Sequence, residues 1–369
     1  MIRVAIVAPS MRILGGQSVQ AQRLLDGWRD DEDIEAWLVP HNPVPPAPLR
    51  PLLNVKYLRT VVTQLCYWPL LLRELRRADV VHIFSASYWS FVLSPLPAVL
   101  VAKAYRKPVL FNYHSGEAPD HLRRSFIAAA VLRAVERNVV PSTFLRDVFE
   151  GHGIRAEVIP NVADLDRFSY RIRDPLRPRV VSTRNFEAHY NVACTLRAFA
   201  RLQTRFPDAT LTLVGAGPEE TALRSQVASL GLRNVTFAGR VAPAEMPRYY
   251  ADADIYVQTP AIDNMPVSVL EAFASGLPVV STDVGGVPGM LRDGVHGLLA
   301  PDDDDAAIAD HMIALLENPD EARQLASAAL ETCRRYVWPV VREQWLAAYR
   351  QLRILPSSRP HDTRASAAS

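Results

Sequence analysis

Two carboxylates stand eight residues apart in the segment Asp263–Glu271, across the start of a predicted helix. Pro266 suits the first helical position, where its missing N–H would be unpaired anyway, and Ser275-Gly276 supplies a stop. A helix N-terminus favours phosphate, so Asp263 would lie at the sugar end of a bound diphosphate. Glu271, about two turns further on, would lie at the ribose end. This layout suits a nucleotide-sugar site; the alternative is a plain helix cap and a solvated glutamate.

The elements that must position this segment alternate between strand and helix along the chain, which implies parallel sheets with a ligand cleft at the strands' carboxyl ends. Strands are predicted at Arg3–Pro9, Ala36–Val39, Val80–Phe84, Val109–Tyr113, Asn138–Val140, Val158–Pro160, Arg179–Thr183, Ala209–Val214, Val235–Ala238, Ile255–Gln258 and Pro278–Thr282. Helices are predicted near Gln17–Trp28, Thr60–Arg77, Tyr88–Tyr105, Thr143–Gly151, Val192–Arg205, Glu219–Leu230, Pro243–Ala251, Pro266–Ser275, Asp304–Leu316 and within Glu331–Leu355.

This alternation predicts an α/β protein with two doubly wound, Rossmann-like domains. At 369 residues, 49% hydrophobic and 22% charged, the chain is long and apolar enough for two packed cores. The charged, proline-containing stretch Asp164–Arg179 suits a linker. We therefore divide the chain into domains at 1–163 and 164–335, C-terminal helices at 336–355 that pack back toward the first domain, and a disordered tail at 356–369.

Composition limits the compartment and the partners. Three cysteines without C-x-x-C spacing argue against a disulfide framework or zinc knuckle and favour the reducing cytoplasm. No secretory leader is recognisable, and Val80–Ala102 carries serines and prolines that make it a poor spanning helix, so we expect a soluble protein. The net charge of +2 gives no reason to expect nucleic acid as a partner.

The stretch Arg50–Lys107 holds nine basic residues against two acidic ones. Within it, apolar residues near helical spacing stand beside arginines, which suggests peripheral docking on the anionic cytoplasmic face of a membrane. The alternative is that these residues pack against the sheet. The apolar residues are Leu65, Trp68, Leu71, Leu72 and Leu75, and the arginines are Arg73, Arg76 and Arg77.

Short motifs follow one another in a recognisable order: Gly15-Gly16, Asp79–His82, Tyr113–Gly116, Pro141-Ser142, Ile159–Phe168, Val214–Glu219, Asp263–Gly276, Val284–Pro288 and Asp293–Leu299. The ordered set resembles glycosyltransferase family 4 over nearly the whole chain. That resemblance implies the GT-B fold, two domains facing across a cleft, with the acceptor side in 1–163 and the nucleotide-sugar side in 164–335. It implies a retaining hexosyltransferase that moves a sugar from a UDP- or GDP-linked donor to a glycan or lipid-linked acceptor in cell-surface polysaccharide or glycolipid synthesis.

The resemblance also implies roles for single residues. His114 would touch the transferred sugar, and Arg184 would grip two phosphate oxygens with its planar fork. These two and Asp263 form the implied catalytic set. Gly16 would let the backbone approach the diphosphate. The implied donor-binding residues are Gly15, Gly16, His189, Gly217, Asn264, Met265, Pro266, Val267 and Glu271.

The chain departs from the family pattern at several positions. His189, followed by Tyr190, stands where the family usually carries a lysine, and no lysine occurs after Lys107. Asp263 is one methylene shorter than the usual glutamate. Pro266 offers no N–H, so that part of the diphosphate cradle would come from the Asn264, Met265 and Val267 amides. Gly289 stands where the family often has an acidic residue.

The implied reaction needs no metal and no cofactor, because arginine and helix-terminal amides stabilise the leaving diphosphate. Asp302–Asp305 is expected to be a helix start rather than a metal cage. A pyridoxal-phosphate phosphorylase is disfavoured by the lack of a second-domain lysine, and a dehydrogenase by the missing third glycine after Val214. A nucleotide-sugar epimerase of the same fold and a non-catalytic binding partner remain as alternatives.

Overall fold

The computed structural model describes residues 1–12, 15–85 and 87–354 and divides them into two compact units, each described here by itself. Unit 1 holds residues 1–140, 148–159 and 342–354, and unit 2 holds 141–147 and 160–341. The predicted boundary at residue 163 differs from this division by four residues, because the Ala163 N–H donates to the Tyr336 carbonyl within unit 2. The predicted disordered tail lies outside the described residues.

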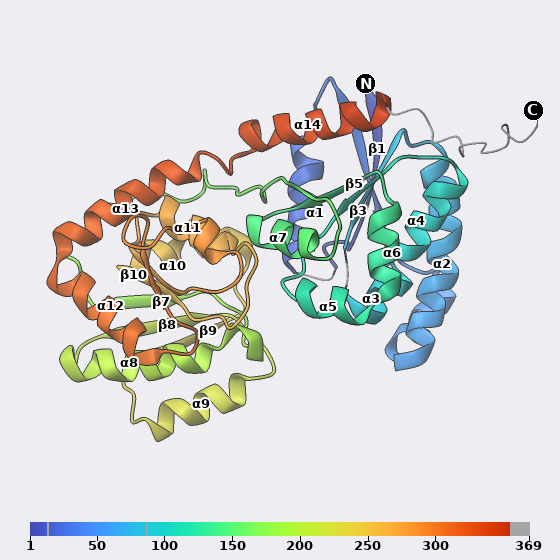
Figure 1. Cartoon of the computed structure of the whole chain (residues 1–369). Coiled ribbons are helices and arrows are strands. Elements are labelled where there is room, and N and C mark those ends of the chain that lie inside the picture. The colour runs from blue at the N-terminus through green and yellow to red at the C-terminus, as the bar shows by residue number, and fades with distance from the viewer. Residues whose placement is uncertain (13–14, 86, 355–369) are drawn as a thin grey trace, which may run out of the picture. The chain divides into compact units, whose positions relative to one another are not determined.

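Unit 1 is a six-stranded parallel sheet in the order β2-β1-β3-β4-β5-β6. Its strands are β1 Ile2–Ala8, β2 Ile34–Pro40, β3 Val80–Phe84, β4 Val109–Asn112, β5 Arg137–Val140 and β6 Glu157–Val158. The helices of this part of the chain are α1 Gly16–Gly27, η1 Ala47–Asn54, α2 Lys56–Arg76, α3 Tyr88–Leu93, α4 Pro95–Ala104, α5 Ala118–Arg124, α6 Phe126–Ala134, α7 Thr143–Gly151 and α14 Trp338–Ile354 (Figure 1).

Unit 2 is a second parallel sheet in the order β12-β11-β10-β7-β8-β9. Its strands are β7 Arg179–Ser182, β8 Thr210–Val214, β9 Val235–Gly239, β10 Ile255–Gln258, β11 Val279–Thr282 and β12 Leu298–Ala300. Its helices are η2 Ala188–Tyr190, α8 Val192–Arg205, α9 Glu220–Ser229, η3 Pro243–Glu245, α10 Met246–Asp252, α11 Val267–Ala274, η4 Val287–Gly289, α12 Asp305–Glu317 and α13 Pro319–Cys333.

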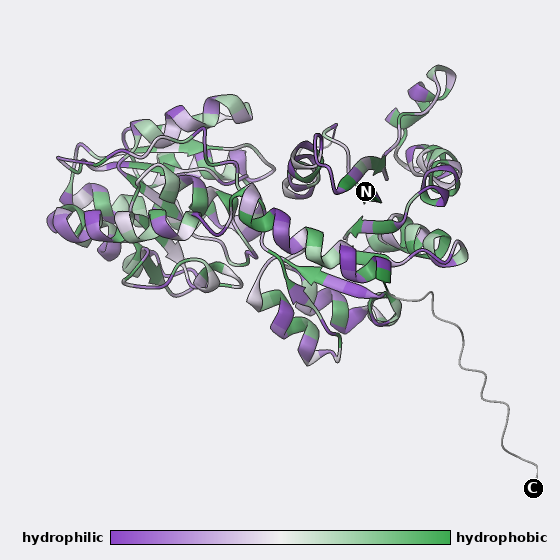
Figure 2. Ribbon diagram, turned by 90° about the horizontal axis from the view of Figure 1, so that it is seen from above, coloured by the Kyte–Doolittle hydropathy of each residue, from purple (hydrophilic) through white to green (hydrophobic). Residues whose placement is uncertain are grey.

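Alternate strand residues build a core on each face of the second sheet. Val180, Ile255 and Val280 pack with α8, α9 and α12, whereas Tyr256 and Val279 pack with α10, α11 and α13. Successive side chains of a strand point to opposite faces, so strands covered on both sides carry apolar residues on both faces. The two helical layers are visible in Figure 1, and Figure 2 shows hydrophobic and hydrophilic residues alternating along the helices.

The predicted fold class is confirmed, and five elements differ from expectation. The helix predicted at Tyr88–Tyr105 is two helices, because Pro95 has no N–H to continue α3 and instead begins α4. Helices α5, α6 and α13 and strand β12 were not predicted. Strand β12 has only three residues, too few to show a period.

Each sheet has one point where the chain reverses its direction of winding. In unit 1 the chain passes from β1 to β2 at one edge and returns with β3 on the other side of β1. In unit 2 it passes from β7 through β8 to β9 and returns with β10 on the other side of β7. Loops that leave such neighbouring strands in opposite directions open a crevice at their carboxyl ends, where ligands of doubly wound folds bind.

A buried histidine joins α14 to the first sheet. His82 Nδ1 lies 2.7 Å from the Tyr349 hydroxyl, and Asn112 Nδ2 donates to His82 Nε2 at 3.1 Å. Burial, assisted by His114, lowers the pKa of His82 to about 3. The ring is therefore neutral at neutral pH, with its proton on Nδ1.

We expect acid to destabilise unit 1 through His82. Its pKa is lower when folded than when unfolded, so the stability it contributes is present above about pH 6.5 and is lost as the pH falls toward 3. Between about pH 7 and about pH 5 the loss should be about 2 kcal/mol. Urea unfolding followed by tryptophan fluorescence measures it, since five of the six tryptophans lie in unit 1.

His82→Gln should be less stable than the wild type at neutral pH and should lose less stability on acidification. Tyr349→Phe is the matched control, because it removes the same contact but keeps the titrating ring. An equally steep acid loss in His82→Gln would contradict this origin.

Candidate active site

The candidate site of unit 2 lies at its switch point, where β7 and β10 end. Arg184 follows β7 and Asp263 follows β10, and Arg184 Nη2 donates to Asp263 Oδ2 at 2.5 Å. Arg184 Nη1 also donates to Ser268 Oγ in α11 at 3.2 Å. The side chains of Arg184 and Asp263 are only 9% and 12% exposed, so this ion pair is shielded from water.

The surroundings of Arg184 favour its charged form. Burial opposes the charge, but Asp263 and three nearby tyrosines hold the pKa of Arg184 above its ordinary value. The Tyr190 ring lies under the guanidinium, with Arg184 Cζ 4.0 Å from the ring centroid. Arg184 Nε is buried and has no hydrogen-bond partner among the described residues. A buried donor of this kind implies a partner that binds from outside the chain, water or ligand.

The second carboxylate, Glu271 in α11, is hydrogen-bonded to a tyrosine of another helix. Burial and the Glu271 carboxylate raise the pKa of Tyr250 well above its ordinary value. The Tyr250 hydroxyl therefore keeps its proton and donates to Glu271 Oε2 at 2.9 Å, while Thr183 Oγ1 lies 2.8 Å from the same hydroxyl. Thr183 precedes Arg184, so both carboxylates of the predicted pair are tied to the end of β7.

Three glycines allow the loops of this site to approach one another. A Cβ on Gly286 would lie 1.8 Å from the Asn264 carbonyl oxygen, and one on Gly285 would lie 2.0 Å from that of Asp263. The Gly286 N–H instead donates to the Asp263 carbonyl at 3.0 Å. A Cβ on Gly217 would lie 2.3 Å from the Phe186 carbonyl oxygen. In the structure, Gly217 therefore packs against the loop that carries Arg184.

The residues before α11 differ from the predicted cradle. The Asn264 N–H already donates to Asp263 Oδ1 at 2.8 Å, and the Asn264 side chain accepts from the Ser142 hydroxyl. The Met265 side chain lies in the core. Pro266 is the N-cap rather than the first residue of α11, and Val267 begins the helix. The amide expected from Asn264 is thus occupied within its own loop.

The His189 side chain lies beside Glu187 and Tyr190. Its Nδ1 lies 3.7 Å from Glu187 Oε2, and its ring contacts Tyr190 with 4.1 Å between ring centroids. Tyr190, rather than His189, is the side chain in contact with Arg184. The neighbouring backbone is fixed, because the Ala261 N–H donates to the His189 carbonyl at 2.9 Å.

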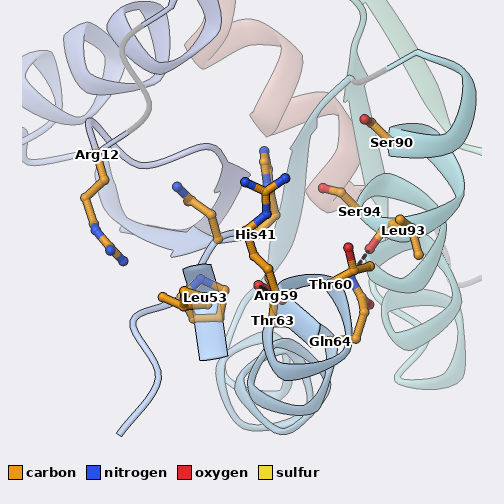
Figure 3. Close-up of a pocket in the computed structure, with 12 residues that line it drawn as sticks. Arg12, His41, Leu53, Arg59, Thr60, Thr63, Gln64, Ser90, Leu93 and Ser94 are labelled. Carbon is orange, nitrogen blue, oxygen red and sulfur yellow. Dashed lines mark hydrogen bonds between the residues drawn. The ribbon is translucent and has the colours of Figure 1, made fainter. Parts of the chain in front are cut away.

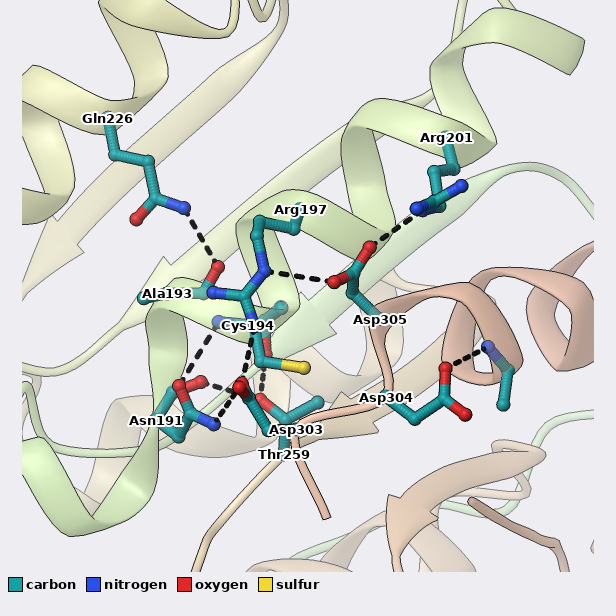
Figure 4. A network of polar contacts seen from close by, with 12 residues as sticks. Asn191, Ala193, Cys194, Arg197, Arg201, Gln226, Thr259, Asp303, Asp304 and Asp305 are labelled. Carbon is teal, nitrogen blue, oxygen red and sulfur yellow. Dashed lines mark hydrogen bonds and ion pairs between the residues drawn. The ribbon is translucent and has the colours of Figure 1, made fainter. Parts of the chain in front are cut away.

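A polar network anchors the segment after Tyr190 (Figure 4). Asn191 caps α8 through the Cys194 N–H and donates to Asp303 Oδ1 at 2.9 Å. Asp305 pairs with Arg197 and Arg201 of α8, and the Asp304 carboxylate caps α12. The acidic run is therefore a helix start tied to α8. Within the described residues, no three metal-ligating side chains gather closely enough to hold an ion.

The predicted residues of unit 1 lie at the carboxyl edge of its sheet. His114 follows β4 and its backbone N–H donates to Ser85 Oγ at 2.9 Å. Burial lowers the pKa of His114 to about 4, so the ring is neutral at neutral pH. Gly15 caps α1, Gly16 begins it, and a Cβ on either would meet nothing within 4 Å. Packing within the chain does not explain these two glycines, unlike Gly217.

Solved structures share this architecture. Anabaena Alr3699/HepE in complex with UDP-glucose aligns with a TM-score of 0.75 and 18% identity, over 95% of this chain and all of that one. Sucrose-phosphate synthase from Thermosynechococcus elongatus aligns with a TM-score of 0.75 and 19% identity, over 95% and 99%. This likeness shows the fold: two doubly wound α/β units of the GT-B type.

The family models cover nearly all of the chain. Residues 14–167 match the model described as Glycosyltransferase Family 4, and residues 166–332 match Glycosyl transferases group 1. The chain belongs to glycosyltransferase family 4. The phosphatidyl-myo-inositol mannosyltransferase of Mycobacterium leprae is 29% identical over 283 residues, 73% of each chain. The D-inositol 3-phosphate glycosyltransferase of Nocardia farcinica is 28% identical over 327 residues, 78% of this chain and 71% of its own.

Several residues of the site were not predicted: Ser142, Tyr250, Ser268, Gly285 and Gly286. Ser142 stood in a quoted motif without a role in the site, and it accepts from the Leu145 N–H at 3.2 Å. The glycine pair stood in a quoted motif without a role. Tyr250 lies in α10, far from any motif, and no sequence signal marks it as the partner of Glu271.

Gly286→Ala should destabilise unit 2 by about 1–3 kcal/mol, because its Cβ would collide with the Asn264 carbonyl and push the Asp263 loop away. Its φ of −91° is ordinary, so the effect is steric alone. Gly151→Ala is the matched control, since a Cβ there meets nothing within 4 Å. Urea unfolding decides: equal stability of the two variants would contradict the tight approach.

Proposed function

We propose that this chain is a retaining, metal-independent hexosyltransferase. It moves a sugar from a UDP- or GDP-linked donor to a hydroxyl of a glycan or lipid-linked acceptor, in the synthesis of cell-surface polysaccharide or glycolipid. The observation that carries the proposal is Arg184, a buried cation at the switch point whose Nε has no partner in the described part of the chain. A phosphate oxygen of the donor would supply the missing acceptor for that N–H. The UDP-glucose complex of HepE and the mannosyltransferase relatives agree with it.

The donor roles follow from the contacts of unit 2. Arg184 would exchange part of its contact with Asp263 for the diphosphate, which frees Asp263 to meet the sugar. Glu271, oriented by Tyr250, would accept from the ribose hydroxyls. Because Asn264 uses its own N–H, the Met265 and Val267 amides at the start of α11 remain for the phosphate.

The reaction replaces one bond to the sugar C1 with another. The bond from the sugar C1 to the diphosphate oxygen breaks, the acceptor oxygen bonds to C1 on the same face, and the acceptor proton leaves with the diphosphate. Arg184 and the amides before α11 stabilise the charge that develops on that leaving group. In unit 1, Gly16 leaves room for a phosphate beside its amide, whereas the Gly15 N–H already donates to Ser18 Oγ at 3.0 Å. Neutral His114 would hydrogen-bond a sugar hydroxyl without adding charge.

Turnover with a panel of UDP- and GDP-linked sugars and a lipid-linked acceptor tests the proposal, with the anomeric configuration of the product read by NMR. We expect a glycosylated acceptor with the donor's configuration. Donor binding without turnover would identify a non-catalytic partner instead, and an altered sugar nucleotide without acceptor transfer would identify an epimerase.

Arg184→Lys should weaken UDP binding at least tenfold, although the charge is kept. A lysine cannot reproduce the fork that contacts Ser268 and Asp263 or the stacking on Tyr190. A charge-assisted hydrogen bond contributes about 1.5–3 kcal/mol, enough for this loss. Isothermal titration calorimetry with UDP measures it, and Arg240→Lys, an exposed arginine of the same unit, is the control.

Adding His189→Lys to Arg184→Lys should restore part of the affinity, because it returns the residue that the family carries at that place. If the double variant binds UDP no better than Arg184→Lys alone, position 189 does not face the phosphates.

Helix α2 has buried and exposed apolar residues, and these test the two interpretations of its sequence, membrane docking and packing against the sheet. Leu71 and Leu75 are fully buried and pack inside unit 1, so they do not face outward as the docking hypothesis assumed. Leu65, Trp68 and Leu72 are 66%, 40% and 46% exposed. No helix in the described ranges is long and apolar enough to cross a membrane.

We infer that this exposed stripe rests on the anionic cytoplasmic face of a membrane, where a lipid-linked acceptor would be found. Arg73 and Arg77 both pair with Glu74 at 2.7 Å, which cancels part of the predicted basic charge. Apolar insertion therefore has to contribute most of the binding, at about 1.5–3 kcal/mol for each large side chain.

Leu65→Gln/Trp68→Gln should reduce flotation with anionic liposomes at least tenfold. Phe126→Gln is the matched control, since Phe126 is 82% exposed but lies on α6. Binding that is unchanged in the double variant, or no stronger to anionic than to neutral liposomes at low salt, would contradict docking through α2.

A further inference from the structure

Unit 1 contains a cavity that none of the proposed donor residues lines. Its volume is about 440 Å³, within the range of small-molecule sites. The loop after β1 contributes Arg12, the loop after β2 contributes His41 and Asn42, and α2 contributes Arg59. Helix α3, which follows β3, closes it with Leu93 (Figure 3). The cavity thus lies at the switch point between β1 and β3, where a doubly wound sheet binds its ligand.

The cavity is electrostatically unbalanced. Arg12 and Arg59 line it, and none of its lining residues in the described part of the chain is Asp or Glu. Neither arginine forms an ion pair with another described residue. Both side chains are exposed, so each guanidinium is available to an anion that enters the cavity.

Asn42, His41 and Gln64 add neutral polar groups to the lining of the cavity. The Asn42 Oδ1 accepts from the Ser10 N–H at 2.9 Å, which turns the Asn42 amide NH₂ away from that bond. Burial lowers the pKa of His41 to about 4, so this ring adds a neutral hydrogen-bonding edge. The Gln64 Nε2 donates to the Leu93 carbonyl at 2.9 Å and ties α2 to α3 across the cavity.

One wall of the cavity continues into the exposed stripe of α2. Thr60 and Gln64 line the cavity, and Val61 and Leu65, the next residue in each case, are 55% and 66% exposed. Residues four apart lie above one another on a helix, so the two pairs form parallel rows, one polar and one apolar. A ligand with an anionic group in the cavity can therefore extend an apolar part along α2.

We propose that this cavity binds the phosphate ester of the acceptor, with Arg12 and Arg59 as the phosphate contacts and the row Val61–Leu65 as the apolar contact. The proposal rests on the proposed function and names its acceptor class, a phosphate-bearing amphiphile. The same phosphate chemistry could come from a phospholipid headgroup or from a water-soluble phosphate ester, and the two are distinguished by the probe.

Calorimetric titration of the full chain tests the cavity without turnover. The probes are dihexanoyl phosphatidic acid and glycerol 3-phosphate. We expect Arg12→Gln/Arg59→Gln to weaken phosphatidic acid binding at least tenfold, whereas Arg29→Gln, an exposed arginine outside the cavity, should bind as the wild type does. Tighter binding of phosphatidic acid than of glycerol 3-phosphate assigns a lipid source, and equal binding assigns a soluble one.

If neither probe binds, or if the wild type and the double variant bind equally well, the proposal is overturned. UDP titration of the double variant should give the wild-type affinity, which shows that the variant is folded. In the transfer assay, the double variant should raise the KM for the acceptor at least tenfold and leave donor hydrolysis unchanged. Transfer with an unchanged acceptor KM would refute phosphate binding in this cavity and leave the proposed glycosyltransferase function standing. Phosphate binding without any transfer would refute the proposed function and leave the binding site standing.

Discussion

The constraint on which unit 2 depends is the burial of a permanent charge. Arg184 cannot give up its proton, so the fold must surround a shielded guanidinium with compensating groups. Asp263, Ser268 and the Tyr190 face provide them, each from a different loop or helix. Removing one partner of a buried ion pair costs about 3–5 kcal/mol, so the loops after β7 and β10 are mutually dependent. The site is thus arranged before any ligand arrives.

Close backbone approach makes that arrangement feasible. Gly285 and Gly286 lie against the carbonyls of Asp263 and Asn264, and Gly217 lies against Phe186, at distances that exclude a side chain. The loops after β8 and β11 therefore support those after β7 and β10. The second carboxylate follows the same logic, since Glu271 is oriented by Tyr250, a residue of a different helix.

Unit 1 handles charge in the opposite way. Two of its buried histidines, His82 and His114, are neutral because burial disfavours their charged form. Arg12 and Arg59, which form no ion pair with another described residue, line a cavity instead. The two units thus differ in charge at equivalent switch points. Unit 2 has an arginine in an ion pair, and unit 1 has two arginines that form no ion pair with another described residue.

The sequence by itself determined the alternation of strands and helices, the two doubly wound sheets and the family. These follow from local patterns: β-branched runs, helical spacing, and punctuation such as Pro95 or Ser275-Gly276. The spacing before and within one helix also marked Asp263 and Glu271 as a candidate pair, and the family resemblance marked Arg184, which the structure pairs with Asp263.

Only the tertiary structure decided the partners of these residues. No pattern in the sequence pairs Tyr250 with Glu271, directs His189 toward Glu187, or divides α2 into a buried and an exposed apolar face. Hydrophobic spacing shows that a helix has apolar residues, but which of them meets the sheet depends on the neighbouring elements. Contacts between residues distant in the chain are set by sheet order and loop approach, which local chemistry does not encode.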